Sequence, residues 1–314
     1  MGLGISSMSN KLCIAVCVYG RKYQCWIPLY IYSINNSYPD YDIKVFVDKK
    51  MSIGIRKLLG SYNLYQKAEF IENIDFTNRY GLKSDIEKRC FRWLCEEERF
   101  DGYDYVYWGD IDIFIQREKT ALLKQHISDM SRTGRCYSNA LRLRIKDYFS
   151  DRDNLSVTHL FRLTGLHFIK KREYYKKVNL VRTLILKYLK GRRIEVIDKL
   201  FFRDDERCLW VLNFLSKTGI PDSSYEISLN AFRPLHGLHF AIGREYATYK
   251  KLLYAGSIHY LEHELYFNQF CYEYNNDPVL RRLIMDSSYY VISIIAKACN
   301  VWEGKLTADG IIKE

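Results

Sequence analysis

The sequence predicts an α/β fold with a mostly parallel sheet flanked by helices and a helical C-terminal region. Segments typical of strands and of helices alternate through the first 115 of the 314 residues, which favours parallel strands joined by right-handed crossovers. Apolar residues make up 48% of the chain, enough for a sizeable core. Near the C-terminus the segment Ile258–Tyr274 is typical of a helix.

The first half supplies the alternation. Short apolar runs bounded by turn residues indicate buried strands, and Ser84 followed by Glu87 is a capping-box signature for a helix start. The expected order is a strand at Leu12–Tyr19, a helix at Trp26–Asn35, a strand at Tyr41–Val47, a helix at Ser52–Tyr65, a short strand at Ala68–Ile71, a helix at Ser84–Arg99 and a strand at Tyr103–Ile115.

The second half is less regular. It is expected to hold a strand at Leu163–Ile169, helices at Lys170–Leu189 and Asp204–Leu215, and a loop with a short strand at Ala231–Ala241. With 5 Pro and no Gly/Ser-rich stretch, no linker is evident. We expect one domain over residues 1–265, with 266–314 as a helical extension packed on it.

Asp110 and Asp112 are the most informative residues of the chain. They lie one residue apart within Tyr103–Ile115, and side chains at i and i+2 of a strand point the same way. Ligands of α/β sheets bind beyond the carboxyl ends of the strands, and paired carboxylates there can hold a hard divalent cation. The alternative is an ordinary Asp-x-Asp in a turn.

The net charge is +11, which suits a polyanionic partner. Much of it lies in residues 170–193, where helical spacing would place Val178, Val181, Ile185 and Tyr188 on one face. This segment is either a solvated helix face or a helix that contacts an anionic membrane surface.

No segment has the roughly 18–20 uninterrupted apolar residues of a membrane span, and no secretory signal is evident. We therefore expect a cytoplasmic protein, with peripheral contact to the inner face of a membrane through the basic helix.

Six motifs follow one another in an order that resembles the GT-A glycosyltransferases, nearest in pattern to the retaining, metal-dependent family 8. The resemblance covers roughly residues 12–265. The motifs are Val18-Tyr19 after the first strand, C-F-R-W-L around Arg92, W-G-D-I-D-I-F at 108–114, T-G-L-H-F-I at 164–169, D-E-R-C-L-W-V-L-N at 205–213, and H-G-L-H-F-A-I-G-R at 236–244.

The resemblance implies a role for each site residue. It implies that Mn²⁺ or Mg²⁺ is held by Asp110, Asp112 and His239, with His236 as the alternative, because the chain lacks the family's Lys-Pro-Trp after Gly243-Arg244. Glu206 is the first candidate for the catalytic carboxylate and Asp205 the second. The residues expected to contact the nucleotide-sugar are Val18, Tyr19, Arg92, Trp108, Gly109, Asp110, Ile111, Asp112, Gly165 and Arg244.

The expected function is transfer of a hexose from a nucleotide-sugar, with UDP favoured, to a glycan or glycolipid acceptor in surface polysaccharide synthesis. A cation bridging two phosphates would stabilise the departing diphosphate, and two carboxylates with an imidazole form a mixed site that Mn²⁺ accepts. The alternative is a nucleotidyltransferase or nucleic-acid-binding protein that uses the paired Asp and the basic surface. No nucleic-acid-binding module is visible, so no nucleic acid is expected as partner. Retention and inversion both stay open.

Overall fold

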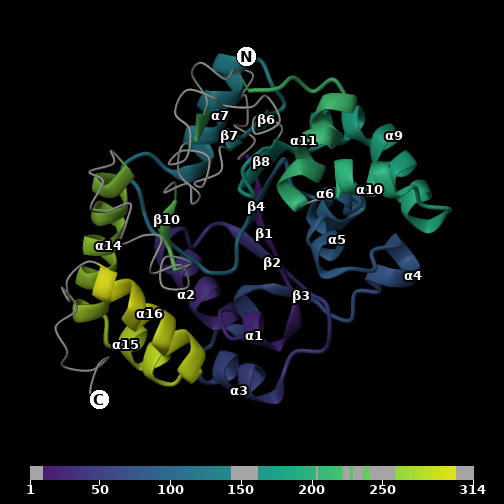
Figure 1. Cartoon of the computed structure of the whole chain (residues 1–314). Helices are drawn as coiled ribbons and strands as arrows, with labels where there is room; N and C mark the ends of the chain where they lie inside the picture. Colours follow the sequence, from purple (N-terminus) through teal and green to yellow (C-terminus); the bar gives the residue numbers. More distant parts are fainter. Residues whose placement is uncertain are drawn as a thin grey trace, which may run out of the picture.

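The computed structural model describes residues 10–142, 162–202, 204–221, 227–228, 236–240 and 259–301. Its centre is a six-stranded sheet in the order β3-β2-β1-β4-β8-β6 (Figure 1). Strands β3, β2, β1 and β4 are mutually parallel, whereas β8 runs antiparallel to both β4 and β6. The predicted fold class, a mostly parallel sheet flanked by helices, is confirmed.

The strands of the large sheet are β1 (Leu12–Val18), β2 (Asp42–Val47), β3 (Glu69–Ile71), β4 (Tyr105–Gly109), β6 (Tyr137–Ser138) and β8 (His167–Lys170). Two small sheets pair β5 (Ile113–Ile115) with β10 (Gly237–His239) and β7 (Leu141–Arg142) with β9 (Ile227–Ser228).

The helices that precede β4 are α1 (Gly20–Gln24), α2 (Ile27–Ser37), α3 (Ile53–Ser61), η1 (Tyr65–Lys67), α4 (Phe76–Tyr80), α5 (Asp85–Arg89), α6 (Phe91–Leu94) and η2 (Glu97–Phe100). Those that follow it are α7 (Leu122–Thr133), α9 (Lys171–Lys190), α10 (Glu195–Phe201), α11 (Asp205–Leu215), α14 (His259–Asn276), α15 (Pro278–Met285) and α16 (Tyr289–Val301).

Helices cover both faces of the sheet, and the alternation of β1 shows why. Leu12, Ile14 and Val16 join a core that includes buried residues of α2, α3, α7 and α14–α16. Cys13 and Ala15, between them, join the opposite core with residues of α4, α6, α9 and α11. Because successive side chains of a strand face opposite ways, a central strand of apolar residues needs a helical layer on each side (Figure 1).

Two expected elements are broken in the structure. The helix expected over Ser84–Arg99 is divided into α5, α6 and η2, although the capping box of Ser84 and Glu87 is present. The strand expected over Tyr103–Ile115 was wrong as a single element. The chain leaves the large sheet after Gly109, turns at residues 110–112, and continues as β5, which pairs with β10 instead.

The C-terminal helices share a core with the sheet. Phe267 and Phe270 of α14 are fully buried in the same cluster as Ile14 and Val16 of β1. The boundary expected between residues 265 and 266 falls inside α14, and the division into domain and extension stays a prediction.

The helices in the described parts of the chain all lack the combination of length and apolar composition that a bilayer span requires.

Candidate functional site

Asp110 and Asp112 lie in the turn that follows β4, at the carboxyl end of a central parallel strand. The Asp112 side chain is buried, whereas that of Asp110 is 36% exposed. In the turn, the backbone N–H of Ile113 donates to the Asp110 carbonyl at 3.3 Å. Both carboxylates lie at the carboxyl end of β4, where the sequence analysis expected them, but a turn, not a strand, positions them.

His239 reaches the two carboxylates from β10, 127 residues after Asp112 in the chain. Its Nε2 lies 3.7 Å from Oδ2 of Asp110 and 3.5 Å from Oδ1 of Asp112. Antiparallel pairing of His239 with Ile113 fixes this approach, and the N–H of Phe240 donates to the Asp112 carbonyl at 2.8 Å. The pairing of β5 with β10 therefore assembles the three side chains.

Gly237 makes that pairing feasible. Its φ is +148°, and a Cβ at this position would lie 1.9 Å from the carbonyl oxygen of Phe114. Only glycine has both the conformational freedom and the space for such a close backbone approach.

His236 occupies a different environment from His239. Its Nε2 lies 2.8 Å from Nε2 of His126, whose Nδ1 is 2.9 Å from the Ser138 hydroxyl. Its backbone N–H donates to Glu118 Oε1 at 2.5 Å, and Tyr266 donates to the same oxygen at 2.6 Å. Burial raises the pKa of Glu118, but the interactions with His236 outweigh it and lower that pKa to about 2. The geometry therefore brings His239, rather than His236, to the paired aspartates.

Arg92, on the short helix α6, links the aspartate turn to the start of α11. Its Nη1 donates to Oδ1 of Asp110 at 2.8 Å and to the carbonyl of Gly165 at 3.1 Å, and its Nη2 donates to the Asp205 carboxylate. Burial opposes the charge of Arg92, but the two carboxylates outweigh it and raise its pKa. Burial likewise raises the pKa of Asp110, yet the charges and hydrogen bonds of Arg92 and His239 bring it well below the ordinary value. Arg92 and Asp110 are thus both held charged.

Gly165 lies where Arg92 needs space. A Cβ here would lie 3.0 Å from Nη2 of Arg92. A side chain at this position would therefore compete with the guanidinium for the space between Asp110 and Asp205.

Asp205 and Glu206 occupy the first turn of α11 and are both buried. The preceding residue, Asp204, caps the helix by accepting the N–H of Arg207 at 2.8 Å. Asp205 turns to Arg92, and its carbonyl accepts the indole N–H of Trp93 at 2.8 Å. Glu206 lies 3.8 Å from the guanidinium of Arg162, so each carboxylate faces a different arginine.

Several residues expected to contact the nucleotide-sugar have buried side chains. Those of Val18, Trp108 and Ile111 belong to the two cores, so they could meet a ligand only through the main chain. A Cβ on Gly109 would lie 2.7 Å from the hydroxyl of Tyr30. Close packing against Tyr30 therefore accounts for the glycine at this position.

Tyr19 is partly buried, and its ring packs against Phe76 with centroids 5.2 Å apart. Its hydroxyl donates to the carbonyl of Lys88, so the phenol is tied to α5. Arg244, the remaining expected contact, lies outside the described residues.

Two charged residues near the site were not expected from the sequence. Arg162 pairs with Asp204 at 2.7 Å, and only tertiary contact brings it to α11. Asp48, directly after β2, accepts the N–H of Gly20 at 3.1 Å. An acid at the end of a predicted parallel strand is a signal that could have identified Asp48.

Around Asp110, Asp112 and His239 the donor types suit a cation such as Mn²⁺, which accepts mixed oxygen and nitrogen ligands. The described residues contain no group of three or more His, Cys, Asp or Glu already arranged around a common metal position. The distances from His239 to the carboxylates show convergence without a fully formed coordination sphere.

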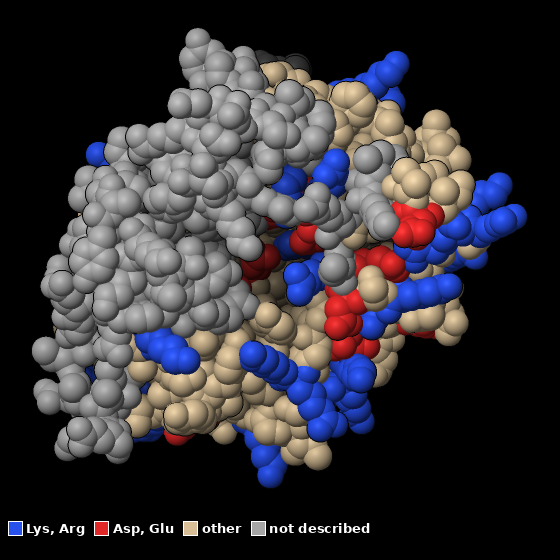
Figure 2. Space-filling view, viewed as in Figure 1, with Lys and Arg blue, Asp and Glu red and all other residues tan. Residues whose placement is uncertain are grey.

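The described surface around this site carries both signs of charge. Figure 2 shows a hollow on this face with acidic and basic side chains gathered around it. This mixture fits a site that combines carboxylates for a cation with arginines for anionic groups.

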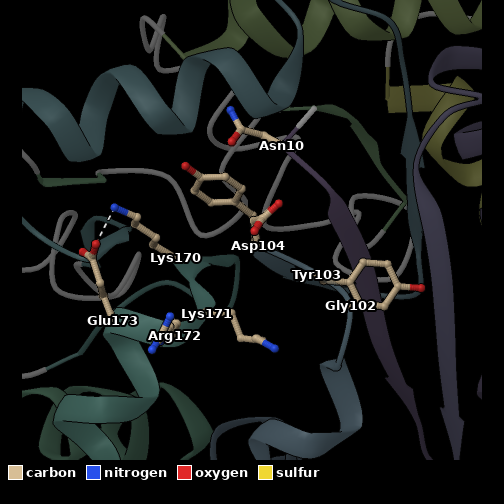
Figure 3. A pocket seen from close by; sticks show the side chains of 9 residues that line it. Asn10, Gly102, Tyr103, Asp104, Lys170, Lys171, Arg172 and Glu173 are labelled. Carbon is tan, nitrogen blue, oxygen red and sulfur yellow. Dashed lines mark ion pairs between the residues drawn. The ribbon is translucent and has the colours of Figure 1, made fainter. Parts of the chain in front are cut away.

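A separate pocket of about 500 Å³ lies at the opposite end of β4, lined by Tyr103, Asp104, Lys170, Lys171 and other residues (Figure 3). β4 spans 5 residues, so at a rise of about 3.3 Å per residue this pocket is roughly 16 Å from the aspartate turn. It is therefore not part of the candidate site.

No protein-family model matches the sequence, and no curated protein matches it significantly. Among solved structures, the chain resembles the galactosyltransferase LgtC in complex with donor and acceptor sugar analogues (15% identity, 65% of this chain and 70% of that chain, TM-score 0.41). It also resembles the glycosyltransferase GlyE of Streptococcus pneumoniae TIGR4 (13%, 77% and 50%, 0.41) and the bifunctional glycosyltransferase WbbM (12%, 96% and 53%, 0.49). The match spans about half of the latter two chains.

Proposed function

We propose that this protein is a metal-dependent glycosyltransferase that moves a hexose from a nucleotide-sugar, with a UDP-sugar favoured, to a glycan or glycolipid acceptor. The observation that carries the proposal is the convergence of Asp110, Asp112 and His239 at the carboxyl end of β4. Arg92 connects this cluster to Asp205 at the start of α11. The topology and the order of these groups agree with the GT-A expectation.

Asp110, Asp112 and His239 would hold Mn²⁺ or Mg²⁺, which would neutralise the charge that develops on the departing diphosphate. Arg92 is fixed by two carboxylates and a carbonyl. It therefore holds its position before any ligand binds, and preorganised cations of this kind stabilise developing negative charge without reorganisation. Its main role is to keep the carboxylates of Asp110 and Asp205 oriented.

Glu206 and Asp205 are the two candidates for the carboxylate that acts at the sugar. Asp205 is neutralised by Arg92, whereas Glu206 faces Arg162 at the longer distance of 3.8 Å. Glu206 is the first candidate because the Asp205 carboxylate is already bound to Arg92. A carboxylate here would act as nucleophile or stabiliser in a retaining reaction, or as base toward the acceptor hydroxyl in an inverting one.

The proposed setting is surface polysaccharide synthesis at the inner face of a membrane. The basic residues 170–193 would keep the enzyme near lipid-linked acceptors, because cationic segments are attracted to anionic leaflets.

The test is a thermal-shift and calorimetric screen of nucleotides and nucleotide-sugars, with and without Mn²⁺, on the wild type and on Asp110→Asn and Asp112→Asn. We expect UDP or UDP-sugar binding that requires the metal, and its loss in both variants without a comparable change in melting temperature. The control is Asp129→Asn on α7, whose carboxylate pairs with Arg132 three residues on.

Metal-dependent binding retained in both variants would refute the metal assignment. Binding of oligonucleotides in preference to nucleotide-sugars would favour the nucleotidyltransferase or nucleic-acid alternative.

A further inference from the structure

Residues 170–193 hold ten Lys or Arg and one Glu, and so carry most of the chain's net charge of +11. They form the end of β8, the whole of α9 and the turn toward α10. Figure 2 shows Lys and Arg gathered along the side of the molecule where α9 lies in Figure 1. Residues 170–193 are therefore the main source of the protein's excess positive charge.

The inner face of α9 is occupied by the protein core. Tyr174, Tyr175, Val178 and Leu189 are buried, and Val181, Ile185 and Tyr188 pack against the same cluster. The apolar stripe expected from the sequence therefore faces the core and is not available to a membrane.

The outer face carries a second set of apolar side chains that the helical spacing did not bring out. Leu180 is 72% exposed and Leu184 is 56% exposed. At 3.6 residues per turn these leucines share a face with Lys176, Lys177 and Lys187. The three lysines are exposed and form no ion pair within the described parts of the chain.

Exposed aliphatic residues continue past the end of α9. Ile194 is 54% exposed and Val196 is 72% exposed, and Ile194 is held against α9 because its backbone N–H donates to the Tyr188 hydroxyl at 2.8 Å. Isolated exposed leucines need no explanation, but aliphatic side chains enclosed by unpaired lysines on one helix form a defined surface.

We infer that the outer face of α9 is a membrane-docking surface, on which Leu180 and Leu184 enter the headgroup–acyl boundary of an anionic bilayer while Lys176, Lys177 and Lys187 contact lipid phosphates. Lysine stems reach along apolar surface and place their charges at the headgroup level. This combination is typical of helices that lie in a membrane interface. A nucleic acid would use the lysines but would leave the leucines in water, so the aliphatic side chains favour a lipid surface.

This surface is coupled to the candidate site through α11. α9 packs on α11, and the amide of Asn213 on α11 donates to the hydroxyl of Tyr174 on α9 at 3.3 Å. Asp205 and Glu206 begin the same α11. Docking through α9 would therefore hold the candidate catalytic helix one helical layer from the lipid, which deepens the proposed glycolipid acceptor.

The pocket beside the start of α9 contributes less to this surface. Lys170 is paired with Glu173, and Lys171 donates to the Phe100 carbonyl at 3.1 Å (Figure 3). These cations are already engaged within the protein, so the lysines further along the helix carry the docking.

The experiment is co-sedimentation of the full chain with vesicles of phosphatidylcholine alone or with about 30% phosphatidylglycerol, a fraction that gives a strongly anionic surface. We expect binding to the anionic vesicles only, weakened by salt. Lys176→Gln/Lys177→Gln should reduce the partition coefficient about tenfold and weaken its salt dependence, because fewer cations remain to contact lipid phosphates. Leu180→Gln/Leu184→Gln should reduce the partition coefficient by a similar factor and leave its salt dependence unchanged.

The matched control is Lys119→Gln/Lys124→Gln, which removes two exposed lysines from another surface and should leave the partition unchanged. Equal loss in this control would show that net charge alone is responsible and would overturn the proposal. Unchanged binding in both α9 variants would also overturn it. So would weaker binding in the lysine variant alone, together with tight binding of oligonucleotides. Metal-dependent UDP binding, measured on the same samples, reports separately on the proposed transferase site.

Discussion

Two carboxylates and one imidazole meet at the end of β4, although the Asp110–Asp112 segment is a turn. The i, i+2 spacing predicted that the two aspartate side chains share a direction because they lie on one strand. In the structure they lie close together because they belong to the same turn. The chain changes sheet between Gly109 and Ile113, and the two aspartates line the crossing. At the residue scale, the motif was therefore located correctly and its local geometry was wrong.

His239, on β10, and His236, directly before β10, should respond differently to replacement. His239→Ala should weaken the apparent affinity for Mn²⁺ by roughly tenfold or more, as expected for loss of a ligating or ligand-orienting group. His236→Ala should instead lower stability by about 1–3 kcal/mol, because it removes a partner of the buried His126. Metal titration of UDP binding, together with thermal melts, measures both effects. The reverse pattern would exchange their roles.

The partly buried Glu118 should make stability depend on acid pH. Its pKa is lowered from 4.5 to about 2 in the folded protein, against burial, by His236, Tyr266 and Gln125. A carboxyl whose folded pKa is depressed adds stability that is full above the unfolded pKa and is lost as pH falls through the folded one. The effect should be at most about 3 kcal/mol, lost between roughly pH 4.5 and pH 2.

Chemical denaturation of the wild type and of Glu118→Gln across this range measures that contribution. The difference in unfolding free energy should shrink as pH falls from 5 toward 2. A difference that stays constant with pH would show that Glu118 is not held ionised by its neighbours.

At the scale of elements, the short antiparallel pair of β5 and β10 determines whether a site exists. The pair is only three residues long, and it brings His239 to a turn that lies far away in the sequence. Arg92 likewise depends on the breaks between α5, α6 and η2. In a continuous helix, the helical repeat alone would set the direction of the Arg92 side chain.

Gly237→Ala should therefore abolish metal-dependent nucleotide binding. The added Cβ would meet the carbonyl of Phe114 at 1.9 Å, so β10 would have to separate from β5. Gly54→Ala is the control, because its Cβ would have open space within α3, and alanine there should stabilise by roughly 0.5–1 kcal/mol. Calorimetric titration of UDP with Mn²⁺ on both variants checks this; full binding by Gly237→Ala would contradict the role of the pairing.

At the scale of the whole molecule, the C-terminal helices complete one face of the sheet. Phe267, Phe270 and Leu280 are fully buried in the core that β1 and α2 share. The described part of this extension supports the sheet, and it adds no residue to the cluster of Asp110, Asp112 and His239.

A chain truncated after residue 265 should therefore lose cooperative folding. Removal of buried phenylalanines costs about 3–5 kcal/mol each, and typical domains have only about 5–15 kcal/mol of stability. Circular dichroism during thermal unfolding of the truncated and full chains measures the change. A sharp transition in the truncated chain would instead show that residues 1–265 fold independently of the helices that follow.

The sequence by itself determined what depends on local periodicity and on chemical type. Apolar runs such as Leu12–Tyr19 gave the parallel strands, the capping box gave the start of α5, and the acids at 204–206 gave the start of α11. The strand pattern also predicted that Asp110 and Asp112 lie at the carboxyl end of a parallel strand, the edge of α/β sheets at which ligands bind.

Only the tertiary structure decided which distant side chains meet. The choice of His239 over His236 near the aspartates, the position of Arg162 beside α11 and the link from Arg92 to Asp205 all depend on contacts between segments far apart in the chain. The same holds for α9, where the core selected which apolar face is buried and left Leu180 and Leu184 outside. Periodicity reports that a helix has an apolar face, but the neighbours that pack against it decide which face is covered.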